Sequence, residues 1–160
     1  MNKAVALDIG DYLQSHDTFR HMSNRLTQIL ADAGRLIPYK QGEHLFRQDQ
    51  PANHFYIVVS GRISVEIPSI YGPPLIVQTL GEGGVLGWSW LIAPYRWTFE
   101  AISETETQII EFDGRNLRKT CDEDPELGYQ LMKCFAGLMS ERLHEARTKM
   151  MESWSAPGFA

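Results

Sequence analysis

Three of the chain's four tryptophans fall within the eleven residues GWSWLIAPYRW, which run from Gly87 to Trp97. Indole rings offer flat apolar faces that stack on planar ligands and attract cations. Arg96 adds a planar guanidinium, whose fork of N–H donors matches the oxygens of a phosphate or carboxylate. Glycine, serine and proline break any strand pattern here, so the stretch is predicted to form an irregular segment. These residue types favour recognition of a small planar anion.

Other kinds of site find no matching pattern. A metal site in a β-roll needs two histidines in H-x-H spacing, because alternate strand residues project inward. His44 and His54 stand ten residues apart. Cys121 and Cys134 fall in helical patterns, where cysteine is usually an inert small hydrophobe. No G-x-S-x-G elbow or P-loop occurs. We therefore expect no metal site and no catalysis.

Composition describes an ordinary globular domain. The 160 residues are 43% hydrophobic and 22% charged, which suits one domain with a substantial core. A formal net charge of −5 argues against a dedicated nucleic-acid binder. No apolar run approaches the roughly 20 residues that cross a bilayer, and no signal peptide is visible at the start. With only two cysteines, the expected location is the cytoplasm, away from membranes.

Short β-rich runs form the middle of the chain. HFYIVV and RISVEI flank Ser60-Gly61, which predicts a hairpin with glycine supplying the positive φ. LIVQTL, RWTFEAIS and TQIIEF continue the series, with QGEH, DQPAN, YGPP and GEGG between the runs. Many short strands at this spacing predict an antiparallel jelly roll. Residues 8–34 have a helical pattern before it.

After Phe112 the pattern is helical again. DGRNLRKTC predicts a short helix, and Asp124-Pro125 opens a long one with a cap and an N1 proline. Two apolar stripes run along the long helix, and we interpret one as facing the roll and the other as facing a second copy. The alternative is that both belong to the core of one chain. The predicted homodimer stripe is Met132, Phe135, Met139, Leu143 and Ala146; the other is Leu127, Leu131, Cys134 and Leu138.

Four segments follow from these patterns. They are an N-terminal helical segment 1–34, a β-roll 35–113, C-terminal helices 114–152 and a tail 153–160. The tail is too short for a helix-turn-helix. We therefore expect no direct DNA binding, and action through another protein or through self-association.

The ordered set of motifs resembles the cyclic nucleotide-binding domain, in particular the sensory domain of catabolite-activator type bacterial regulators. The resemblance covers Leu26 to Met150 and implies a cyclic nucleotide-binding-like double-stranded β-helix followed by a long C-terminal helix. The matching residues are Gly42 with Leu45-Phe46 and Gln48, Tyr56-Ile57 through Ser60-Gly61, the turn from Gly81 to Gly87, Asp124-Pro125 and Arg142-Leu143.

The resemblance also implies a phosphate-binding cassette within 83–98. In the family it is a glycine, a glutamate that takes the ribose hydroxyl, a short helix, and an arginine about ten residues later. Gly87 matches the glycine, but Trp88 stands in the glutamate's place. Arg96 is the candidate arginine, although alignment on Ala101 gives that position to Tyr95. The ligand-site residues implied are Gly87, Trp88, Ser89, Trp90, Tyr95, Arg96, Trp97 and Thr98.

Two functions follow. In the first, a non-catalytic sensor binds a cyclic nucleotide or another small anionic effector in the roll and signals through its long helix. In the second, aromatic residues have filled the pocket, and the protein is an effector-free dimeric interaction module. No other cofactor is implied.

Overall fold

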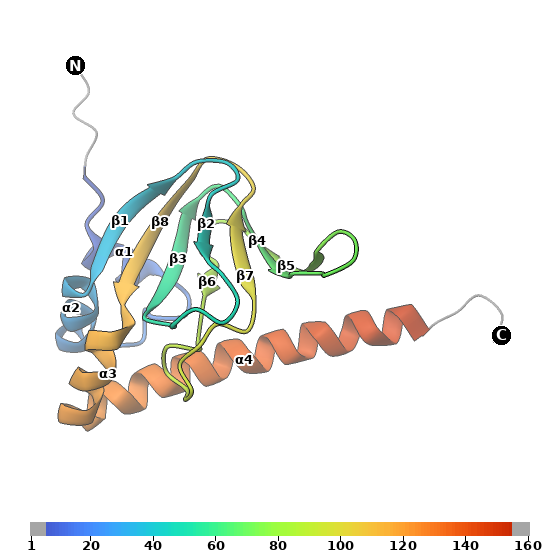
Figure 1. Ribbon diagram of the computed structural model, residues 1–160. Helices are drawn as coiled ribbons and strands as arrows, with labels where there is room; N and C mark the ends of the chain where they lie inside the picture. Colours follow the sequence, from blue (N-terminus) through green and yellow to red (C-terminus); the bar gives the residue numbers. More distant parts are fainter. Residues whose placement is uncertain (1–5, 155–160) are drawn as a thin grey trace, which may run out of the picture.

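The computed structural model of the chain describes residues 6–154 (Figure 1). Two four-stranded antiparallel sheets face each other, with strand orders β1-β8-β3-β6 and β2-β7-β4-β5. The predicted jelly roll and long C-terminal helix are confirmed. The elements are α1 (Ile9–Ser15), α2 (Asn24–Asp32), β1 (Gly34–Tyr39), β2 (His44–Phe46), β3 (His54–Ser60), β4 (Ile63–Ile67), β5 (Leu75–Leu80), β6 (Val85–Leu86), β7 (Glu100–Ser103), β8 (Thr107–Asp113), α3 (Gly114–Glu123) and α4 (Pro125–Trp154).

The chain does not form the predicted hairpin at Ser60-Gly61. It turns there from one sheet into the other, and we call such a turn between the sheets a corner. β3 pairs with β6 and β8, whereas β4 pairs with β5 and β7. Gly61 has φ +89°, and a Cβ there would lie 2.4 Å from the carbonyl oxygen of Glu106 in the β7–β8 corner. The two corners are also joined by the backbone N–H of Glu104, which donates to the Arg62 carbonyl at 2.9 Å. Glycine is required because the corners pack directly on each other.

Sheet β1-β8-β3-β6 has a separate core on each face. Along β3, Phe55 and Ile57 face the helices, while Tyr56 and Val58 face the inside of the roll. This alternation follows from the two-residue period of a strand. The helix-side core is aromatic, with the Phe55 ring stacked on Phe112 at 4.4 Å. The roll is therefore fixed to its helices by the same strand that lines its interior.

α4 runs beneath the roll and is anchored at its first residues (Figure 1). The Arg25 guanidinium contacts the carboxylates of Asp124 and Glu126 at 2.6 and 2.7 Å, which ties α2 to the beginning of α4. This guanidinium holds the pKa of Asp124 below its ordinary value. The side chains of Leu127 and Leu131 are fully buried against the helix-side core. The first turns of α4 are thus the fixed end of the helix.

Phe135 lies on the inner face of α4, although its spacing suggested the outward stripe. Its side chain is 1% exposed and packs edge-on against Phe55 and Trp90. The reason is geometric, since Phe135 follows Leu131 by four residues and residues at i and i+4 share a helix face. Met132 and Leu143 are exposed, and Met139 is half-buried.

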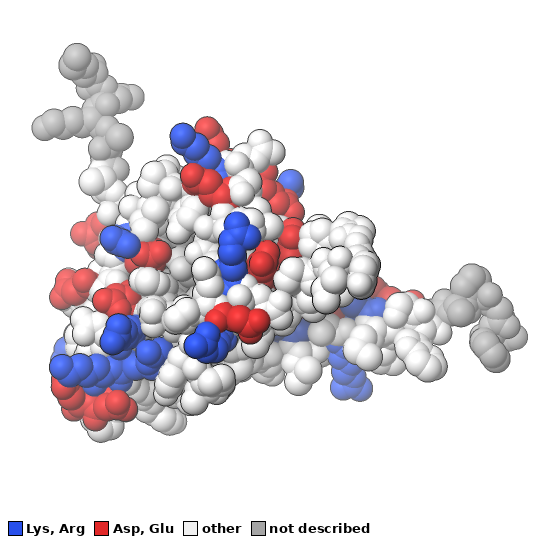
Figure 2. Space-filling view, in the orientation of Figure 1, with Lys and Arg blue, Asp and Glu red and all other residues white. Residues whose placement is uncertain are grey.

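Two apolar surfaces project from the body of the protein. One is the far half of α4, where Leu143 is 72% exposed and the helix continues to Trp154. The other is the β4–β5 hairpin, whose tip exposes Ile70 and Tyr71 and forms an uncharged surface in Figure 2. Of the predicted tail, residues 155–160 lie outside the described residues. No helix in the described part of the chain is long and apolar enough to cross a membrane.

Candidate functional site

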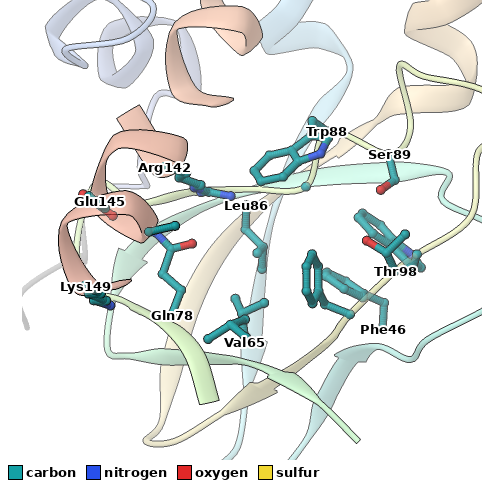
Figure 3. A pocket seen from close by; sticks show the side chains of 15 residues that line it. Phe46, Val65, Gln78, Leu86, Trp88, Ser89, Thr98, Arg142, Glu145 and Lys149 are labelled. Atoms are coloured by element: carbon teal, nitrogen blue, oxygen red, sulfur yellow. The ribbon is translucent and has the colours of Figure 1, made fainter. Parts of the chain in front are cut away.

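A cavity of about 190 Å³ lies where the open end of the roll meets α4 (Figure 3). The strands and the segment after β6 form most of its wall, and one face of α4 closes the side. Its lining residues are Phe46, Val65, Val77, Gln78, Leu86, Gly87, Trp88, Ser89, Trp97, Thr98, Phe99, Arg142, Glu145, Ala146 and Lys149.

Stacked aromatic rings line the wall inside the roll. The Phe46 and Trp97 rings lie 3.7 Å apart with an interplanar angle of 11°. Trp97 is 4% exposed, and Val65 and Leu86 lie in the same interior cluster. Apart from Gln78, every side chain that the strands place on this wall is apolar. This part of the cavity therefore favours an apolar, flat group.

Gly87 lets the Trp97 ring lie directly against the backbone. Its φ is +93°, and a Cβ at this position would lie 2.7 Å from Cη2 of Trp97. Only glycine tolerates both conditions, because it reaches positive φ without strain and has no side chain. The glycine matched to the family's cassette thus shapes the cavity wall.

α4 supplies the charged groups of the site. Arg142, Glu145 and Lys149 are spaced by three and four residues and line the cavity together, as Figure 3 shows. The Arg142 guanidinium donates to the Val85 carbonyl and lies 4.7 Å from the centre of the Trp88 ring. Burial lowers the pKa of Arg142 below its ordinary value. One side chain thus connects α4, strand β6 and the cavity.

The structure separates the predicted ligand residues. Gly87, Trp88, Ser89, Trp97 and Thr98 line the cavity; Trp90, Tyr95 and Arg96 do not.

Trp90 belongs to the helix-side core. It is 0% exposed, and its ring lies 5.2 Å from Phe55. The implied short helix after Gly87 is replaced by a turn, in which the Leu91 N–H donates to the Trp88 carbonyl at 3.0 Å. Trp88 and Trp90 consequently lie in different surroundings, with Trp88 at the cavity and Trp90 in the helix-side core.

Neither candidate for the cassette arginine position faces the cavity. The Arg96 guanidinium donates to the Asp49 carbonyl at 2.5 Å on the exposed surface. The Tyr95 ring instead lies under the Arg118 guanidinium, at 4.1 Å. The phosphate contact that the resemblance implied is therefore not formed by either residue in this arrangement.

Sequence reasoning missed the cations of the site. Arg142 was matched only to the long helix of the family, and Lys149 was not predicted to have any role. Their spacing with Glu145 on one helix face was the available signal. Nothing in the local pattern indicated that this face would meet the segment after β6. Ala146, predicted on the homodimer stripe, also lines the cavity.

A second ionisable cluster of the roll, around Glu111, is paired internally. The Glu111 carboxylate accepts from Nε and Nη2 of Arg35 at 3.1 and 2.7 Å, and His54 lies 3.7 Å away. Within residues 6–154, no group of three His, Cys, Asp or Glu side chains stands in an arrangement that could hold a metal ion. The cavity beside Trp97 remains the strongest candidate site.

Comparisons with known proteins agree with this architecture. A solved cyclic nucleotide-binding domain from Methylobacillus flagellatus has a TM-score of 0.76 at 14% identity, over 91% of this chain and 82% of that one. The CRP-like cAMP-activated global transcriptional regulator of Mycobacterium tuberculosis is 23% identical over 100 residues, 62% of this chain and 45% of the relative. The cAMP-dependent protein kinase regulatory subunit of Dictyostelium discoideum is 25% identical over 114 residues, 69% of this chain and 35% of the relative.

The chain spans less than half the length of these two curated relatives. The family model for the cyclic nucleotide-binding domain matches residues 36–124, which is more than half of the chain and includes the entire roll from β2 to β8. The chain therefore belongs to the cyclic nucleotide-binding domain family.

Proposed function

We propose that this protein is a non-catalytic sensor domain that binds a small effector in the cavity between the roll and α4. The observation that carries the proposal is the position of Arg142. It lines the cavity, donates to the Val85 carbonyl and lies over the Trp88 ring. An effector that enters the cavity meets the side chain that attaches α4 to the roll.

Signalling would use the unequal attachment of α4. Its first turns are buried through Leu127, Leu131 and Phe135, whereas Leu143 and the turns beyond it are exposed. An effector that binds better when Arg142 is released, or better when it is held, shifts the balance between two positions of the far half. The two states are α4 with the Arg142 contact to the roll and α4 without it.

The partner that we propose is a second copy of the chain. Met132, Leu143 and Met150 lie on one exposed face of α4, at a spacing that suits packing against an equivalent helix. Met139 on the same face is half-buried, and Phe135 is no longer part of it. Transmission to a further protein would start from this helix pair.

Leu143→Glu is expected to convert a dimer to monomer, because a carboxylate in the centre of a helix–helix contact is desolvated without a partner. Sedimentation or light scattering after gel filtration measures the change. Thr148→Glu adds the same charge to an exposed position on another face of α4 and should leave the mass unchanged. Equal masses for wild type and Leu143→Glu would remove this face from the interface.

A specific observation favours the alternative of an effector-free module. The Phe46–Trp97 stack leaves about 190 Å³, below the roughly 300–1,000 Å³ typical of drug-sized ligand sites. Tryptophan fluorescence separates the two functions, since Trp88 and Trp97 both line the cavity.

We expect an effector to change this fluorescence and to raise Tm, because it binds only the folded state. Cyclic AMP and cyclic GMP are the first probes. If neither of them nor phenylacetate alters fluorescence or Tm, the sensor proposal fails and the effector-free function stands.

A further inference from the structure

The cavity has the dimensions of one aromatic ring. A cavity of about 150 Å³ lined by apolar side chains accommodates benzene. At about 190 Å³, this one has room for a ring with a short substituent. A purine joined to a ribose and a phosphate exceeds that volume. The volume of the cavity therefore favours a single ring over an entire cyclic nucleotide.

The surroundings of the ring position are aromatic and aliphatic. The lining includes the aromatic rings of Phe46, Trp97 and Phe99 and the aliphatic side chains of Val65 and Leu86. Aromatic side chains favour offset-stacked or edge-to-face contact with a planar ring. The position after Gly87, where the family carries a carboxylate for ribose hydroxyls, holds Trp88 instead. The wall formed by the roll therefore favours an apolar ring over a sugar.

The charged side chains at the edge of the cavity favour a ligand with a single negative charge. Arg142 and Lys149 contribute two positive charges and Glu145 one negative charge, which leaves a net charge of +1. The side chains of Gln78, Ser89 and Thr98 also line the cavity and make no hydrogen bond to another residue within 6–154. They are available as donors to a carboxylate. A guanidinium is well suited to receive the two oxygens of such a group.

Building on the proposed function, we propose that the effector is a single-ring aromatic carboxylate. Its ring packs against the stacked Phe46–Trp97 wall, and its carboxylate faces Arg142 and Lys149 on α4. The carboxylate would then attract the Arg142 guanidinium, which attaches α4 to β6. Ring and carboxylate have separate roles, the ring supplying apolar contact and the carboxylate the signal to α4.

Titration of the full chain with phenylacetate, phenylacetamide and cyclic AMP tests the proposal, with calorimetry and tryptophan fluorescence as readouts. Phenylacetate is expected to bind at least tenfold more tightly than its neutral amide, and cyclic AMP is expected not to bind. Lys149→Gln should weaken phenylacetate severalfold while leaving the amide unchanged, and Arg142→Gln should weaken it at least tenfold. Arg96→Gln removes an exposed cation that faces away from the cavity and is the matched control.

Equal affinity for the acid and the amide would overturn the proposed recognition of a carboxylate. A Lys149→Gln variant that binds phenylacetate like wild type would overturn it too. Lys149 is exposed, so this variant keeps the test independent of folding. Binding of cyclic AMP without phenylacetate would overturn the inference and leave the sensor proposal intact. Binding of neither probe would overturn the inference, and it would overturn the sensor proposal as well once cyclic GMP also fails to bind.

Discussion

Phe135→Ala is expected to lower the free energy of unfolding by about 3–5 kcal/mol, the usual cost of truncating a buried aromatic side chain to alanine. The Phe135 ring contacts Phe19, Phe55 and Trp90, with ring centroids 5.2 to 6.4 Å apart, so its loss leaves a cavity between α4 and the roll. Denaturant unfolding followed by fluorescence measures the change.

Leu143→Ala is the matched control for this prediction. It removes a large apolar side chain from the same helix, but from a position that is 72% exposed. In protein dilute enough to be monomeric, it should change stability by no more than about 0.5 kcal/mol. The two variants should also differ in assembly, because only Leu143 lies on the proposed homodimer face. A Phe135→Ala variant of normal stability and reduced mass would contradict the placement of Phe135 in the core of one chain.

Gly61→Ala is expected to destabilise the protein by roughly 3 kcal/mol or more, since left-handed backbone strain of about 1–3 kcal/mol adds to a clash. The new Cβ would lie 2.4 Å from the Glu106 carbonyl oxygen and 2.7 Å from Oγ1 of Thr107. Both atoms belong to the neighbouring β7–β8 corner, so the corners must separate to make room.

Gly42→Ala isolates the contribution of that contact. Gly42 has φ +85°, close to the +89° of Gly61, but a Cβ added there would meet no atom within 4 Å beyond its own chain neighbours. This variant should show only the conformational cost of about 1–2 kcal/mol. Thermal unfolding of the two variants side by side gives the difference. Equal losses of stability would mean that the contact between the corners contributes nothing.

Local sequence patterns predicted the elements well, because strand alternation, turn residues and helix caps act over a few residues. Which strands pair with each other could not be predicted from local patterns. Ser60-Gly61 has the composition of a hairpin, yet its strands enter different sheets, and only contacts with the distant β7–β8 corner decide between the two arrangements. Turn chemistry predicts a reversal of the chain but not the sheet that the next strand joins.

The site was predicted in part, for the same reason. Gly87, Trp88 and Trp97 line the cavity, and their clustering in the sequence was a sufficient signal. Trp90 was indistinguishable from Trp88 by composition, because the turn after Gly87 decides which way each indole points. Arg142 approaches Trp88 from 54 residues away, so no local pattern could show this pairing.

The length of α4 beyond Arg142 has a mechanical consequence. Trp154 lies twelve residues beyond Arg142, which at about 1.5 Å of rise per residue corresponds to an arm of about 18 Å. A tilt of about 10° around the Arg142 attachment would carry the end of this arm through about 3 Å. A rearrangement of one guanidinium can thereby be amplified into a displacement larger than the helix shifts of about 1–2 Å that accompany switching at subunit interfaces.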